Sequence, residues 1–133
     1  MKNKSSFVLA GIVMCAFMPV FSGSLRAASL RDVVINEIAW MGTAASTYDE
    51  WIELYNTTGD TITLTNWTLS SADGTPSITL SGSIAPYGYF LLERSDDNTV
   101  SDISADQIYT GALGDAGEDF SLKDSSDTVI DRV

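Results

Sequence analysis

The residues of this chain that could do chemistry are almost all carboxylates. Of its 133 residues, 18 are Asp or Glu and none is His. Without His, the chain cannot build a Ser-His-Asp or Cys-His nucleophile system, an HExxH zinc site or a His general base. It contains no GxSxG motif, and Gly111, Gly114 and Gly117 lack the spacing and the Lys of a phosphate-binding loop. Any catalysis would therefore depend on carboxylates.

Asp49, Glu50 and Glu53 form the arrangement nearest to a catalytic carboxylate pair. Glycoside hydrolysis needs an acid and a base or nucleophile about 5 to 10 Å apart. Glu50 and Glu53 stand an odd number of positions apart in a run that alternates as a strand does, so we expect them to face opposite sides and to share no cleft. We interpret the three residues as solvated edge charges and a turn cap, and we predict no catalytic residue.

Glu37 is a carboxylate inside an apolar stretch, between Ile35 and Ile38. A carboxylate that loses its water in such a place must find hydrogen-bond donors. We therefore predict that loop amides donate hydrogen bonds to Glu37.

Two acidic turns could supply oxygen ligands for calcium. They are Asp96-Asp97-Asn98 with Asp102, and Asp115 with Glu118 and Asp119. Calcium needs six to eight oxygens, and neither turn matches the DxDxDG loop or a GGxGxD repeat. We therefore expect no metal and no other cofactor. Calcium remains the alternative to plain solubilising charge.

Aromatic side chains offer a different kind of site, a platform for a sugar or a peptide. Alternation along one predicted strand places Ile52 and Leu54 on an inner face, and Trp51, Glu53 and Tyr55 on the outer face. Trp51, Glu53 and Tyr55 are therefore the candidate interaction surface.

The elements that must position these side chains are strands. From residue 33 onward, short runs rich in Val, Ile, Thr, Tyr and Trp alternate with a period of two, and Gly, Asp, Asn and Pro separate them. The predicted strands are Val33–Ala39, Glu50–Asn56, Thr61–Leu64, Trp67–Ser70, Ser77–Leu80, Tyr89–Glu93, Gln107–Thr110, Phe120–Lys123 and Thr128–Arg132. Strands recurring about every ten residues are typical of a sandwich, and the long linkers at 41–49 and 95–105 favour a sandwich over a closed barrel.

Alternation also predicts which side chains meet in the core. Besides Ile52 and Leu54, the predicted core members are Ile62 and Leu64, Trp67 and Leu69, Ile78 and Leu80, Phe120 and Leu122, and Val129.

The first 28 residues form a predicted secretory signal peptide. A cationic start is followed by an uncharged apolar run from Phe7 to Phe21, which is shorter than the roughly 20 residues that span a bilayer. Small residues place the cleavage after Ser24, Ala27 or Ala28, and the sequence does not choose between them. We expect a secreted or cell-envelope protein. An uncleaved membrane anchor is the alternative, and only then would the protein contact the membrane.

The domain that remains, residues 29–133, is strongly acidic. It keeps four Lys or Arg against 18 Asp or Glu, a net charge of −14, which disfavours a nucleic acid partner because the phosphates would be repelled. The only Cys, Cys15, lies in the signal peptide, so the domain must be stable without a disulfide.

Five stretches together carry a family resemblance. They are Val34-Ile35-Asn36-Glu37-Ile38-Ala39-Trp40, Asp49-Glu50-Trp51-Ile52-Glu53-Leu54-Tyr55-Asn56, Leu64-Thr65-Asn66-Trp67-Thr68-Leu69, Ile84-Ala85-Pro86-Tyr87-Gly88-Tyr89 and Gly117-Glu118-Asp119-Phe120-Ser121-Leu122. In this order they resemble the lamin tail domain family in its bacterial, exported form, over about residues 33–133. The resemblance implies an immunoglobulin-like β-sandwich that acts as a binding or scaffolding module, with no catalytic residues to carry over.

The chain also departs from the best-known members of that family. Animal lamins carry a coiled-coil rod and a prenylated C-terminal Cys, and this chain has neither, so filament assembly and a nuclear role do not transfer. The last predicted strand runs to Val133 with no closing segment. We therefore predict a shortened gene product, or a domain that originally continued into another.

The sequence thus predicts an all-β, immunoglobulin-like β-sandwich preceded by an N-terminal signal-peptide helix. The preferred function is an exported, non-catalytic binding or scaffolding module whose partner is a protein or a cell-envelope polymer. The alternative is a carbohydrate-binding or carboxylate-based glycan-hydrolysing domain. A cleft with two carboxylates on adjacent strands beside a stacked Trp would favour the alternative.

Overall fold

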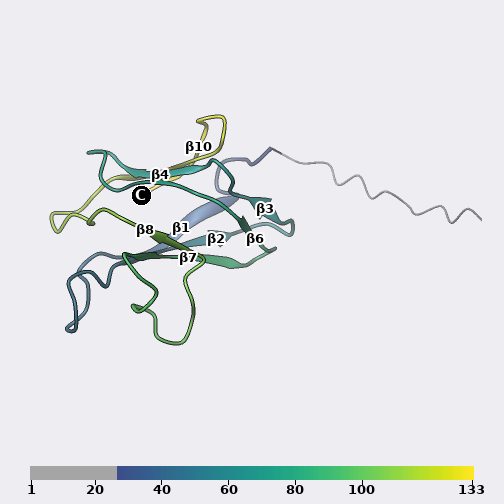
Figure 1. The fold of residues 1–133 in the computed structure, drawn as a ribbon. Coiled ribbons are helices and arrows are strands. Elements are labelled where there is room, and N and C mark those ends of the chain that lie inside the picture. The colour runs from purple at the N-terminus through teal and green to yellow at the C-terminus, as the bar shows by residue number, and fades with distance from the viewer. Residues whose placement is uncertain (1–26) are drawn as a thin grey trace, which may run out of the picture.

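The structure, a computed structural model, describes residues 27–133. Every regular element in this part of the chain is a strand (Figure 1). No helix among the described residues is both long and apolar enough to cross a membrane. The predicted signal-peptide helix lies outside the described residues.

Two four-stranded sheets pack face to face. The first sheet has the order β1 (Val33–Ala39), β2 (Trp51–Asn56), β7 (Tyr89–Arg94) and β8 (Gln107–Tyr109). The second sheet has the order β10 (Val129–Arg132), β9 (Phe120–Lys123), β4 (Thr68–Ser71) and β5 (Ser77–Thr79), and a small third sheet pairs β3 (Ile62–Thr63) with β6 (Ser83–Ile84). All pairs are antiparallel except β7 with β8. The predicted immunoglobulin-like sandwich is confirmed.

All nine predicted strands are present, and their ends differ from the prediction by no more than one residue. Only β6 was missed. It has two residues, which are too few to show an alternating pattern.

The core between the sheets follows the predicted alternation. Ile52 and Leu54 of β2 are fully buried beside their β7 partners, and Leu69 and Leu122 face them from the second sheet. Val129 is an exception, because its side chain is 41% exposed. A β-bulge between Val129 and Asp131 adds a residue to β10, so the inner position passes to Ile130.

Along each long side of the sandwich, a side chain of one sheet forms hydrogen bonds with backbone groups of the other. On one side, the Asp131 carboxylate of β10 accepts a hydrogen bond from the Ile35 amide of β1, at 2.9 Å. On the other side, the Gln107 side chain of β8 accepts from the Ser81 amide at 3.0 Å and donates to the Thr79 carbonyl at 2.9 Å. All three bonds use backbone groups at a sheet edge, which would otherwise lack partners.

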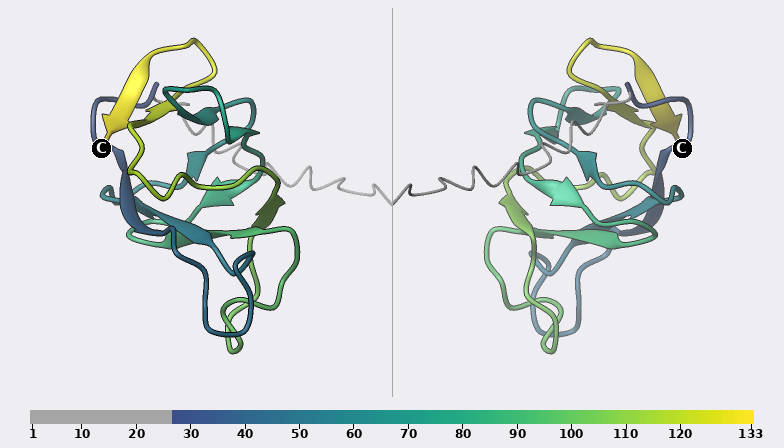
Figure 2. Two further views of the ribbon diagram at one scale, coloured as in Figure 1. Left: turned by 90° about the vertical axis from the view of Figure 1, so that its left-hand side faces the viewer. Right: turned by 90° about the vertical axis from the view of Figure 1, so that its right-hand side faces the viewer.

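Two connecting segments shape one end of the sandwich, and a third covers the outer face of the first sheet. Segments 40–50 and 95–106 extend from the same side of the first sheet (Figures 1 and 2), and segment 110–119 links β8 to β9 across the two sheets. At the last strand, the backbone of Val133 exchanges two hydrogen bonds with that of Phe120. The candidate site lies where segments 40–50 and 110–119 meet.

Candidate functional site

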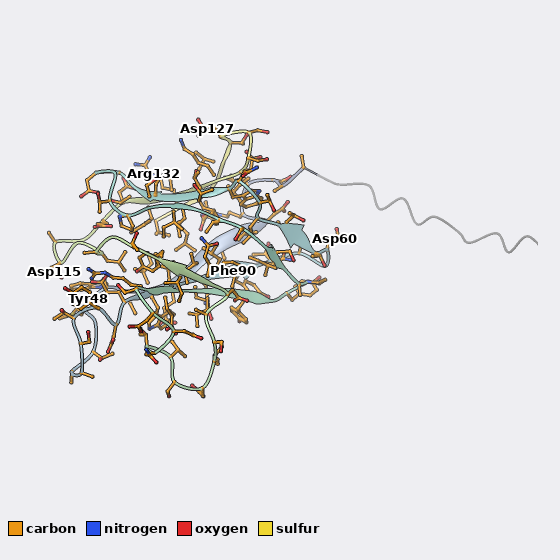
Figure 3. The ribbon with its side chains drawn as sticks, in the orientation of Figure 1. Tyr48, Asp60, Phe90, Asp115, Asp127 and Arg132 are labelled. Carbon is orange, nitrogen blue, oxygen red and sulfur yellow. The ribbon has the colours of Figure 1, made fainter. Side chains whose placement is uncertain are left out.

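A groove of about 610 Å³ lies at this end of the sandwich, and we call it the end groove. Its lining residues come from segments 40–50 and 110–119 and from the end of β7: Trp40, Met41, Thr47, Tyr48, Glu50, Arg94, Ala112, Leu113 and Asp115. A smaller hollow of about 210 Å³ shares Trp40 and Leu113 with it. Figure 3 places Tyr48 and Asp115 at this end and Asp60 at the opposite end.

A buried ion pair forms the floor of the end groove. Glu50 Oε1 lies 2.9 Å from Arg94 Nη1, and Glu50 Oε2 accepts a hydrogen bond of 2.9 Å from the Leu113 amide. The Arg94 guanidinium lies over the Tyr48 ring, 4.7 Å from its centroid. Glu50 therefore joins the end of β2 to β7 and to segment 110–119, and the ion pair carries no net charge.

The burial of Glu50 corrects one prediction. Its side chain is 5% exposed, so Glu50 is not a solvated edge charge. The reason is its parity, since Glu50 continues the inner face of Ile52 and Leu54 beyond the first residue of β2. The predicted separation from Glu53 is confirmed, because Glu53 lies on the other face of β2.

Tyr109 lies behind the ion pair with its hydroxyl buried. No described residue forms a hydrogen bond with this hydroxyl. Burial is the main cause that raises the pKa of Tyr109 above its usual value, and the negative charge of Glu50 acts in the same direction. The hydroxyl therefore stays neutral beside the ion pair.

The prediction for Glu37 is wrong, and a different carboxylate has the predicted environment. Glu37 is exposed because a bulge between Ile35 and Glu37 shifts the register of β1. Glu93 of β7 is fully buried, and its carboxylate accepts hydrogen bonds from the amides of Thr99 at 3.0 Å and Val100 at 2.9 Å. These bonds hold segment 95–106 against the outer face of the first sheet.

The sequence carried a signal that could have found Glu93. It follows the unbroken apolar run Phe90-Leu91-Leu92, and such a run is typical of a strand that is covered on both faces. A carboxylate that continues this strand is then expected to be covered as well.

The candidate interaction surface is brought together as predicted. Trp51, Glu53 and Tyr55 are all half-buried on the outer face of β2. Glu53 Oε1 accepts a hydrogen bond of 2.6 Å from Asn36, and the rings of Tyr55 and Tyr89 lie 4.8 Å apart at 36°. The three residues share a face, and their role in binding stays a prediction.

The two acidic turns proposed for calcium use carboxylates as structural acceptors. Asp97 accepts a hydrogen bond of 2.7 Å from the Ala105 amide, and Glu118 accepts one from the Gly114 amide. Asp119 pairs with Arg132, and this hydrogen bond lowers the pKa of Asp119. Among residues 27–133, no group of three or more His, Cys, Asp or Glu is arranged to hold a metal ion.

Comparison with known proteins identifies the family. A search of curated proteins gives no match. The family model of the Lamin Tail Domain matches residues 26–133, which is most of the chain and includes both sheets and the end groove. The chain therefore belongs to the lamin tail domain family.

Proposed function

We propose that this immunoglobulin-like domain is an exported, non-catalytic binding module whose partner is a protein or a cell-envelope polymer. The observation that carries the proposal is the exposure of large apolar side chains around the end groove. Trp40 is 40% exposed, Met41 71% and Tyr48 58%. Apolar and aromatic side chains gathered in a solvent-open groove are characteristic of interaction sites.

The placement of the acids supports a non-catalytic role. Glu50 and Arg94 neutralise one another in the floor of the groove, and Glu50 is further held by the Leu113 amide. A glycosidase acid must exchange protons with substrate, whereas both oxygens of Glu50 are bound within the domain. Glu53, the other member of the sequence pair, lies on the opposite face of β2.

A comparison of two binding assays tests this proposal. The protein is immobilised and exposed to cell-envelope fractions and, separately, to a glycan array. Saturable binding to an envelope component, without any change in that component, is the expected result. Release of sugars from a bound glycan, abolished in Glu50→Gln, would refute the proposal and favour the carbohydrate-hydrolysing alternative.

Export is part of the same proposal, and the fold bears on where the signal peptide is cut. Ala28 is half-buried and packs against the core cluster. Cleavage after Ser24 or Ala27 preserves this contact, whereas cleavage after Ala28 removes it. We therefore expect the mature protein to begin at residue 25 or 28, which mass spectrometry of the secreted form measures. A mature form that begins at Ser29, or a full-length form in the cytoplasm, would contradict this expectation.

A further inference from the structure

We propose that the end groove binds a segment of a partner protein that combines Lys or Arg with apolar side chains. This inference rests on the proposed binding function and names the site and the chemistry of its ligand. Two properties of the groove carry it, the apolar side chains at its rim and the sign of the charge around it.

The apolar rim is presented by a braced loop. Within segment 40–50, the Thr43 amide donates to the Ser46 carbonyl at 2.9 Å, and the Asp49 amide donates to the same carbonyl at 3.3 Å. The Thr43 hydroxyl also forms a hydrogen bond with the Asp49 carboxylate. These bonds brace the backbone of the loop that exposes Met41 and Tyr48, so the loop itself loses little further freedom when a ligand binds.

The residue types at the rim match the centre of a protein interface. Trp, Tyr and Arg are the residues most enriched among those that dominate binding energy, and Met adapts its shape to different partners. The end groove presents all four types within one hollow, as Trp40, Tyr48, Arg94 and Met41.

The charge around the groove selects a cationic ligand. Glu50 and Arg94 cancel, whereas Asp115 at the rim has no ion-pair partner among the described residues. The domain as a whole carries a net charge of −14. Of its four cations, Arg94, Lys123 and Arg132 are paired with acids of the domain itself.

Two attractive interactions at this site therefore favour a Lys or Arg of the partner. This cation is attracted by the acidic surface over a distance of about one Debye length, and it can rest on the exposed ring of Trp40, which lines the same groove as Asp115. A neutral oligosaccharide would gain nothing from the first of these effects. Charge complementarity thus favours a cationic peptide over a sugar.

Titration with short synthetic peptides tests the proposal on the protein expressed from its full sequence. One peptide alternates Lys with Leu, the second replaces each Lys by Glu, and the third replaces each Leu by Ser. A neutral chitin oligosaccharide is the fourth ligand. We expect saturable binding of the Lys-Leu peptide, weakened by salt, and binding of the other three that is at least about tenfold weaker.

The indole N–H signals of the three Trp residues locate the binding. Trp40 should shift on titration, whereas Trp67 is buried and Trp51 lies on the outer face of β2. Tyr48→Ala should weaken binding about tenfold or more, and Asp115→Asn should weaken it and reduce its dependence on salt. Tyr89→Ala is the matched control, because Tyr89 is also 58% exposed but does not line the groove.

Several results would overturn the inference. They are equal binding of the Glu peptide, preference for the oligosaccharide, absence of binding, or a Tyr89→Ala effect as large as that of Tyr48→Ala. Peptide binding that shifts Trp51 and not Trp40 would overturn the site while leaving the proposed binding function intact. Sugar release from a glycan would refute the proposed function itself.

Discussion

Replacing Glu50 by Gln should lower the free energy of unfolding by about 2 to 4 kcal/mol. At an effective dielectric constant of about 20, opposite charges about 4 Å apart attract by about 4 kcal/mol, and removing one partner of a buried pair costs about 3 to 5 kcal/mol. The Glu50 and Arg94 side chains are only 5% and 15% exposed, so water screens them little. Gln keeps the size of Glu and can still accept from the Leu113 amide, so we expect a somewhat smaller loss than the about 3 to 5 kcal/mol for complete removal of one partner, about 2 to 4 kcal/mol.

Urea unfolding of four proteins measures the effect and assigns its cause. The wild type, Glu50→Gln, Arg94→Gln and the double variant form a thermodynamic cycle, and we expect a coupling of about 1.5 kcal/mol or more between the two sites. Glu53→Gln is the control, since it neutralises a carboxylate on the outer face of the same strand and should change stability by no more than about 0.5 kcal/mol. A coupling below that size, or equal effects of Glu50→Gln and Glu53→Gln, would refute the reasoning.

Three further predictions concern other ionisable groups. Glu93→Ala removes the acceptor of two backbone amides, so it should destabilise the domain by about 2 to 4 kcal/mol and speed hydrogen exchange in segment 95–106; unchanged exchange there would contradict the assignment. The pKa of Tyr109 in the folded domain is raised above the ordinary 10.0. The protonated Tyr109 hydroxyl therefore contributes to stability fully below pH 10.0, and this contribution is lost as the pH rises through the raised pKa. In an absorbance titration at high pH, one of the five Tyr should therefore ionise only with unfolding, and ionisation of all five before unfolding would be inconsistent with its burial. The pKa of Asp119 is lowered below 3.8 by its hydrogen bond with Arg132. The contribution of the ionised Asp119 to stability is therefore present above pH 3.8 and is lost as the pH falls through the lowered pKa. Urea midpoints of Asp119→Asn should consequently differ from those of the wild type at neutral pH and converge with them in acid.

Alternation was sufficient to predict most of the sandwich. Side chains of a strand point to opposite faces in turn, so the burial of Ile52 and Leu54 and the outward direction of Glu53 follow from neighbouring residues alone. The prediction failed where an extra residue enters a strand. Bulges in β1 and β10 reverse the parity, which exposes Glu37 and Val129 although local sequence places them in apolar runs.

The candidate site was harder to predict because its parts are far apart in the chain. Tyr48 and Glu50 lie in one segment, Arg94 ends β7, and Leu113 and Asp115 belong to the link between β8 and β9. No local pattern encodes the distance between such segments. Glu50 looked like an edge charge because its partners, the Arg94 guanidinium and the Leu113 amide, are absent from its sequence neighbourhood.

The amino-acid sequence by itself determined the all-β class, the order of nearly all strands and the faces of most of them, because these depend on the types and spacing of neighbouring residues. It also determined the strongly acidic charge, and its motifs indicated the family. Only the tertiary structure decided which carboxylates are buried and which side chains surround the end groove. These properties depend on the packing of the two sheets and on where the long segments come to rest, and both are set by contacts between residues distant in the chain.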